Sequence, residues 1–202
     1  VLKSIPDEAT RLAMLKRGEA DVVYLLQSAL AEEARRTAGL TLRPTPIVST
    51  HWLAFLDQWD PKSPWADRRV RLAANHAINR QILNEAITLG FSRITWSIIP
   101  QSFDFYWQPP AYAYDPAKAK QLLAEAGFPG GKGLPPLVLG PNPRGFGPKL
   151  AAEVVAAMLQ ENLGIQAQVQ VLDIAKWRQD LRKKDVFAAV TGWTADVADP
   201  ND

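Results

Sequence analysis

A chain of 202 residues that is 47% hydrophobic and 22% charged has the composition of a globular protein with one sizeable core. The formal net charge is only +2 and no basic block is present, so nucleic-acid binding has no electrostatic support. The absence of cysteine excludes disulfide bonds and thiolate chemistry, and no apolar run is long enough to span a membrane.

Two helices and three strands are predicted before residue 57. The first helix begins at the acidic pair Asp7 and Glu8, which is favourable near a helix N-terminus, and Gly18 ends it. The second helix covers 27–37 and ends before Gly39. Apolar segments bounded by turn residues predict strands at 20–25, 40–48 and 50–56.

A proline-containing loop at 57–67 precedes two further predicted helices. Apolar residues at helical spacing predict the first of these, and they are Val70, Ala73, Ala74, Ala77 and Ile78. Asn79 is a suitable N-cap for the second helix, 80–89. His76 lies on the first helix, and because His51 is the only other histidine, a packed or solvated residue is favoured over a metal ligand.

The segment 91–113 is long, irregular and rich in aromatic residues and proline. Segments of this length without regular structure are usually functional or packed as small units of their own. Two interpretations remain open. The aromatic residues either form a flap over a cleft or pin the segment to the surface.

Strands and helices alternate in the rest of the chain. Asp115 and Pro116 begin a helix that Gly127 ends, and Asp173 caps a helix over 174–184. Further elements are predicted as a strand at 137–139, a helix at 150–162, and strands at 165–172 and 186–193. This order predicts an α/β sheet with helices packed on it.

The strand 186–193 ends in Gly192 and Trp193, and a polar, acidic stretch follows. Ligands of open α/β sheets lie beyond the carboxyl ends of the strands, so Trp193 and Asp196 are placed where a ligand would bind. The alternative is that Trp193 fills the core and that Asp196 caps a turn.

Four segments carry a family resemblance. Residues 67–80 (DRRVRLAANHAINR) resemble D-x-R-V-R-x-A-x-x-x-A-I-D-R, and residues 114–128 (YDPAKAKQLLAEAGF) resemble Y-D-P-x-K-A-K-x-L-L-x-E-A-G-Y/F. Residues 164–177 resemble G-I-x-V-x-V followed by a tryptophan, and residues 192–196 resemble G-W-x-A-D. Their order is that of the family 5 extracellular solute-binding proteins, the dipeptide, oligopeptide and nickel receptors of bacterial ABC importers.

The resemblance implies a fold and a domain organisation. The fold is an α/β lobe of the type II periplasmic binding protein class, with a mixed sheet flanked by helices. We expect a piece of a longer, two-lobed protein, in which 1–27 belongs to the first lobe and its crossing. Residues 28–190 then form the second lobe, and 191–202 form the return crossing. Trp65 is expected to be a packing anchor, because the family has an aromatic residue after proline there.

The resemblance also implies a site and partners. The ligand-binding residues are expected to be Gly192, Trp193, Thr194, Asp196 and Trp177, with Asp196 pairing with the α-amino group of a peptide. Trp177 has a second interpretation, in which it packs on the sheet. The partners are a peptide or similar small solute and the membrane permease, and a lipid anchor would lie outside this chain. A monomer at the periplasmic or outer face of the membrane is expected, with no cofactor or metal.

One position departs from the family pattern. Val190 occupies the site where some oligopeptide receptors have an arginine for the ligand carboxylate, which puts an oligopeptide ligand in doubt. Nickel-complex and oligosaccharide receptors use the same scaffold, so these ligands stay open. An enzyme using Asp196 and Asp199, or Asp202, is a further alternative, although no Ser-His or Cys-His nucleophile has a recognisable context. A domain that only docks on the permease is another.

Overall fold

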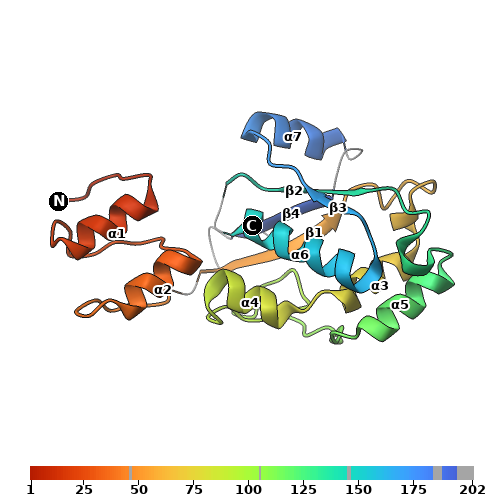
Figure 1. The fold of residues 1–202 in the computed structure, drawn as a ribbon, viewed down its shortest axis with the longest axis horizontal. Helices are drawn as coiled ribbons and strands as arrows, with labels where there is room; N and C mark the ends of the chain where they lie inside the picture. The colour runs from red at the N-terminus through yellow and green to blue at the C-terminus, as the bar shows by residue number, and fades with distance from the viewer. Residues whose placement is uncertain (46, 105, 145–146, 184–187, 195–202) are drawn as a thin grey trace. The chain divides into compact units, whose positions relative to one another are not determined.

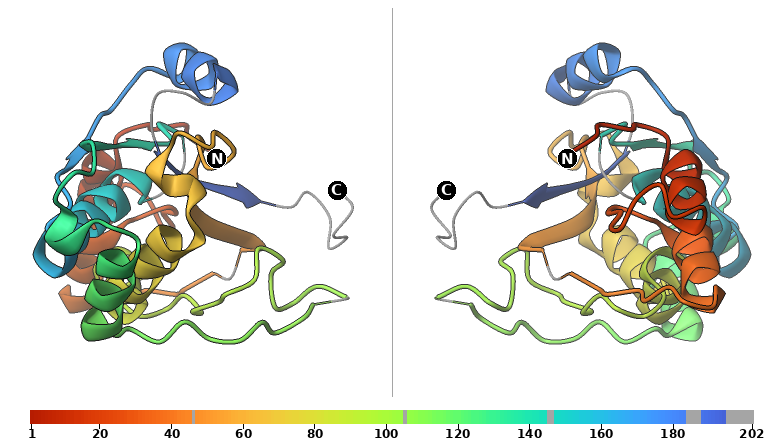
Figure 2. Two further views of the ribbon diagram at one scale, coloured as in Figure 1. Left: turned by 90° about the vertical axis from the view of Figure 1, so that its right-hand side faces the viewer. Right: turned by 90° about the vertical axis from the view of Figure 1, so that its left-hand side faces the viewer.

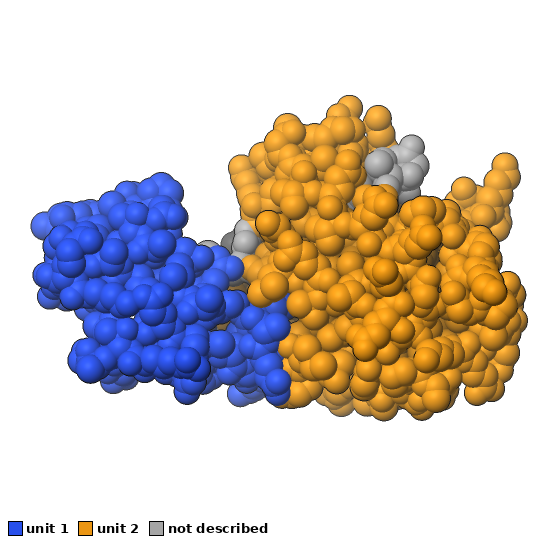
Figure 3. All heavy atoms as spheres, viewed as in Figure 1, with its two compact units in different colours: residues 1–46, 84–93 blue, residues 47–83, 94–202 orange. Residues whose placement is uncertain are grey.

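The computed structural model describes residues 1–45, 47–104, 106–144, 147–183 and 188–194. The chain forms two compact units (Figure 3). Unit 1 comprises Val1–Pro46 and Asn84–Arg93, and unit 2 comprises Ile47–Leu83 and Ile94–Asp202.

Unit 1 is built from α1 (Glu8–Lys16), α2 (Ser28–Arg36) and the last residues of α4 (Arg80–Thr88). Asp7 caps α1 as predicted, since its Oδ1 accepts a hydrogen bond from Thr10 N at 2.7 Å. A hydrogen bond of 3.0 Å from Ser28 Oγ to the Ile87 carbonyl ties the start of α2 to α4.

The predicted strand at 20–25 is wrong. This segment has no regular structure, and Val22 and Tyr24 are 82% and 71% exposed. A strand forms only when its backbone groups pair with another strand, and no strand in the described part of the chain lies beside this segment.

Unit 2 contains a four-stranded mixed sheet in the order β1-β4-β2-β3. Its strands are β1 (Ser49–Phe55), β2 (Leu137–Pro141), β3 (Ala167–Val169) and β4 (Ala188–Thr194). β4 is antiparallel to β1 and parallel to β2, and β2 is also parallel to β3. The predicted α/β fold with a mixed sheet is therefore confirmed.

Two strand predictions differ from the structure. The described residues of 40–48 form no strand, and Pro44, which lacks a backbone N–H, stands in the middle of this segment. The strand predicted over 165–172 is limited to the three residues of β3, although the alternation of apolar residues extends further.

Helices cover both faces of the sheet (Figure 1). α3 (Arg68–Ala77), α5 (Pro116–Glu125) and α6 (Pro148–Leu163) pack on one face and build the main core. α7 (Ile174–Lys183) packs on the other face. Short 3-10 helices occur at Pro64–Ala66 and Pro129–Gly131.

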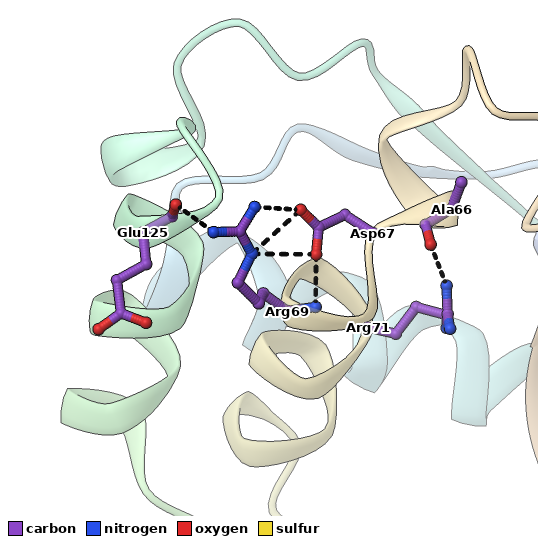
Figure 4. A network of polar contacts seen from close by, with 5 residues as sticks. All are labelled: Ala66, Asp67, Arg69, Arg71 and Glu125. Atoms are coloured by element: carbon purple, nitrogen blue, oxygen red, sulfur yellow. Dashed lines mark hydrogen bonds and ion pairs between the residues drawn. The ribbon is translucent and has the colours of Figure 1, made fainter.

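The charged residues of the segment 67–80 have a structural role (Figure 4). Asp67 caps α3 by accepting a hydrogen bond from Arg69 N at 2.7 Å, and it pairs with the Arg69 guanidinium at 2.6 Å. Arg69 also donates to the Glu125 carbonyl at the end of α5, at 2.8 Å. The side-chain hydrogen bond from Arg69 lowers the pKa of Asp67, so the ion pair at the start of α3 persists at neutral pH. This pair holds the Arg69 guanidinium where it donates to α5 through the Glu125 carbonyl.

Two predictions about single residues in this region are confirmed. Trp65 is a packing anchor, because it is 4% exposed and stacks on Phe55 with the ring centroids 4.1 Å apart. His76 is a packed residue. It is 8% exposed, its Nδ1 lies 2.8 Å from the Ala113 carbonyl, and its ring meets Tyr112 edge-on.

Candidate functional site

The carboxyl end of β4 pairs closely with the start of β1. Thr50 lies opposite Trp193, and His51 lies opposite Gly192. A Cβ atom at Gly192 would lie 2.8 Å from the Thr50 carbonyl oxygen and 2.9 Å from Cγ of the His51 ring. Only glycine therefore lets the two strands approach this closely at the position before Trp193.

Two hydroxyl groups fasten the end of this strand pair. Ser49 Oγ donates to the Trp193 carbonyl at 3.0 Å, and Thr194 Oγ1 donates to Ser49 Oγ at 3.0 Å. Ser49 and Thr194 are directly opposite each other in the register. The pairing is thus maintained up to the last described residue of β4, which fixes the backbone of the predicted site residues Gly192, Trp193 and Thr194.

The strand register places Trp52 and Trp193 on the face of the sheet that α7 covers with Trp177. Side chains alternate along β4, so Trp193 shares the face of Ala189, which packs against Trp177 of α7. On β1, Trp52 shares this face with Ala54, another neighbour of that cluster. Trp52 and Trp193 are diagonal neighbours, a relation in which Cα atoms lie about 7 to 8 Å apart. This aromatic face consists of Trp52, Trp177 and Trp193.

Trp177 is the buried member of the aromatic face. It is 5% exposed, and its indole Nε1 donates a hydrogen bond of 3.1 Å to the Gly140 carbonyl in β2. Trp177 therefore attaches α7 to the sheet in this structure, while Trp52 and Trp193 are half-buried. A ligand contact by Trp177 stays a prediction.

The irregular aromatic segment reaches the same end of the sheet. In both views of Figure 2, residues 94–104 and 106–113 extend toward the side on which β4 ends. Phe103 of this segment meets Trp193 edge-on, with ring centroids 6.4 Å apart and an interplanar angle of 73°. The segment thus borders the aromatic face, which sequence patterns alone did not reveal.

His51 brings a titratable group to this end of the sheet. Its side chain remains accessible to solvent, but partial desolvation against the strand pair lowers its pKa from the ordinary 6.5. The imidazole is therefore predominantly neutral at neutral pH.

Several residues with a predicted role lie outside the described part of the chain. Asp196, Asp199 and Asp202 belong to this group, so the amino-group role of Asp196 and the alternative carboxylate chemistry stay predictions.

Val190 is 6% exposed and belongs to the main core. Among the described residues, no group of three or more His, Asp or Glu side chains could hold a metal ion, and no helix is long and apolar enough to cross a membrane.

An open hollow of about 570 Å³ lies at the opposite end of β1 from Trp193. Its lining residues are Leu56, Asp57, Trp59, Asp60, Lys62, Ser63 and Lys183. None of the predicted site residues lines it. Asp57 accepts a hydrogen bond from the Ser63 hydroxyl group. The lining contains two acidic and two basic residues, so the charge of the hollow favours neither anions nor cations.

Sequence reasoning did not single out Trp52 or Phe103. The sequence offered one indication for Trp52, because this residue lies within the predicted strand 50–56, which also contributes apolar residues to the core. Its relation to Trp193 depends on which strands pair, and the sequence does not specify that. Phe103 carried no signal beyond being one of several aromatic residues in the segment 91–113.

Comparisons with known proteins agree with this architecture. The family profile described as "Bacterial extracellular solute-binding proteins, family 5 Middle" matches residues 1–202. The chain is 28% identical to heme-binding protein A of Haemophilus influenzae, covering 100% of this chain and 36% of that protein. It is 30% identical to probable di/tripeptide-binding protein 5 of Pseudomonas aeruginosa, covering 97% of this chain and 36% of that protein.

A solved structure shows the same fold. It is the ABC transporter-associated periplasmic binding protein DppA from Helicobacter pylori, in complex with the peptide STSA. The TM-score is 0.72 and the identity is 26%, over 98% of this chain and 37% of that chain. The present chain therefore spans little more than a third of the length of the relatives it matches. Because the family profile covers every residue, the chain belongs to family 5 of the bacterial extracellular solute-binding proteins.

Proposed function

We propose that this chain supplies one wall of the solute-binding site of an ABC importer receptor. The solute is a peptide or a similar small molecule, and it lies between this wall and a second lobe. The observation that carries the proposal is that Trp52 and Trp193, the half-buried members of the aromatic face, lie toward the carboxyl end of β4. Aromatic surfaces with few polar groups are typical of ligand sites, and β4 delivers Trp193 to the edge where α/β sheets bind ligands.

A peptide is the favoured solute class. The Pseudomonas relative is named as a probable di/tripeptide-binding protein, and the Helicobacter periplasmic binding protein is in complex with a peptide. In this proposal Asp196 pairs with the peptide α-amino group, because a carboxylate in a closed and partly dry cleft interacts more strongly with an ammonium than one in water. Gly192 and Thr194 hold the main chain that presents Trp193.

The proposal includes a domain arrangement and partners. Residues 28–190 form the second lobe, residues 1–27 belong to the first lobe and its crossing, and residues 191–202 form the return crossing. The receptor is a monomer at the periplasmic face of the membrane, it delivers its solute to the permease, and it carries out no catalysis. Closure of two lobes around a solute is the usual conformational change of such receptors.

The first experiment is native mass spectrometry of the full-length protein, purified without refolding so that a bound solute is retained. A series of short peptide masses supports the proposal and the role of Asp196. A single heme, sugar or metal complex keeps the receptor function and removes the amino-group role from Asp196. Turnover of a solute by the protein would show an enzyme and would overturn the proposal.

Substitution of Asp196 tests its role in the same protein. Asp196→Asn removes the charge while keeping the shape, so peptide binding weakens by about tenfold or more if the ammonium contact exists. N-acetylated peptides, which lack the ammonium, then bind the wild type and the variant equally. Equal affinity of both proteins for free peptides would remove Asp196 from the site.

A further inference from the structure

Phe103 differs from the residues around it in the aromatic segment. It is 5% exposed, whereas Ile98 and Trp107 on either side of it are each 67% exposed. A large side chain buried between exposed neighbours is one of the points at which the segment is attached to the rest of unit 2.

The main chain around Phe103 is held by turns. Phe103 N donates to the Pro100 carbonyl at 3.1 Å, and Tyr106 N donates to the Phe103 carbonyl at 3.3 Å. Pro100 is itself buried, and its ring restricts the backbone where the turn begins. The direction of the Cα–Cβ bond of Phe103 is therefore set by the backbone.

The Phe103 ring meets the indole of Trp193 edge-on, at 6.4 Å and 73°. This arrangement matches the quadrupoles of the two rings and has a preferred geometry, unlike an aliphatic contact. Trp193 is half-buried and lies at the end of its strand, so the contact with Phe103 restricts the rotamers of the indole.

We propose that Phe103 is a positioning residue for Trp193, through which the segment at 100–104 controls solute affinity. This inference rests on the proposed function, because it requires Trp193 to contact the solute. A fixed indole loses less side-chain entropy when a solute binds, so the ring contact raises affinity without touching the solute.

Four variants of the full-length protein separate this role from simple packing. Phe103→Leu keeps an apolar anchor but removes the ring, and Phe103→Tyr keeps the ring. Trp107→Ala is the matched control, since it removes an exposed aromatic side chain from the same segment. Trp193→Ala tests the proposed function directly.

Two measurements are made on each protein. The first is the ¹⁹F NMR spectrum of the protein labelled with 5-fluorotryptophan, in which Trp193→Phe assigns the Trp193 resonance. The second is affinity for a defined library of di-, tri- and tetrapeptides, ranked by mass spectrometry and measured by calorimetry for the tightest member. We expect Phe103→Leu to shift the Trp193 resonance and to weaken binding by about two- to tenfold. Phe103→Tyr and Trp107→Ala should resemble the wild type in both.

The outcomes distinguish a failure of the positioning role of Phe103 from a failure of the proposed function. If Trp193→Ala weakens binding but Phe103→Leu leaves the resonance and the affinity unchanged, the positioning role is wrong and the proposed function stands. If Trp193→Ala binds as tightly as the wild type, or the wild type binds no member of the library, the proposed peptide site fails and the inference fails with it. A shifted resonance without any change of affinity would also overturn the inference.

Discussion

At residue scale, the lack of a side chain at Gly192 allows the close approach of β4 to β1. Its missing Cβ would approach the Thr50 carbonyl to 2.8 Å, and a backbone oxygen has little freedom to move away. Gly192→Ala should therefore lower the free energy of unfolding by about 1 to 3 kcal/mol, the usual cost of overpacking. Urea denaturation measures this change.

A second substitution separates the two contacts at Gly192. His51→Ala combined with Gly192→Ala removes the ring contact and leaves the backbone contact, so we expect only part of the stability to return. An unchanged midpoint for Gly192→Ala alone would show that the strand pair can separate locally, and that the glycine is not required.

His51 should make stability depend on pH in a defined direction. Its pKa is lowered in the folded state, so the unfolded state binds a proton more readily below the ordinary value of 6.5. The wild type should therefore lose stability as the pH falls below about 6.5, until the lowered native pKa is passed. Thermal unfolding compared with His51→Gln, in which this contribution is absent, measures the effect; parallel pH profiles would contradict it.

The sequence could predict a site residue only where a motif within a short stretch of chain indicates it. Trp177 and Trp193 stand within recognisable motifs, and Gly192 is part of one of them. Trp52 and Phe103 join the site only through a strand register and a ring contact that span long stretches of chain. Patterns along the sequence contain no information about such contacts.

At the scale of elements, the helices were predicted well because their signals are local. Asp7, Asp67, Asp115 and Asp173 each accept hydrogen bonds from the first turn of a helix, and each stands directly before it in sequence. Strands depend on distant partners. The apolar segment at 20–25 has strand composition but no partner, so composition alone gave the wrong assignment.

The attachment of α7 to the sheet depends on Trp177. Trp177→Phe keeps most of the buried surface and removes the donor for the Gly140 carbonyl, leaving that oxygen without its 3.1 Å hydrogen bond. We expect the free energy of unfolding to fall by about 1 to 3 kcal/mol, which is the usual cost of an unsatisfied buried polar group.

Chemical denaturation measures the change at Trp177. Trp59→Phe is its control, since Trp59 is 80% exposed and its substitution should have almost no effect. Equal stability of the two variants would show that water replaces the indole at Gly140.

At the scale of the whole molecule, the chain has a core of its own but supplies only one wall of the proposed site. The main core joins three helices to the sheet within unit 2. We therefore expect the isolated chain to fold cooperatively and to bind peptides weakly or not at all, because half a cleft cannot exclude water. Calorimetry on the isolated chain and on the full-length protein measures the difference. Submillimolar peptide binding by the isolated chain would contradict this expectation.

The antiparallel pair of β1 and β4 has a consequence for the order of folding. Phe55 pairs with Ala188, roughly 130 residues later, so β1 has no partner until most of the chain has been made. At ribosomal rates of about 5 to 20 residues per second, that interval lasts roughly 7 to 26 seconds. During this time a seven-residue strand that contains tryptophan, leucine and phenylalanine is unpaired. Such strands associate with other chains, so nascent β1 needs protection, for example by a chaperone, until β4 has been made.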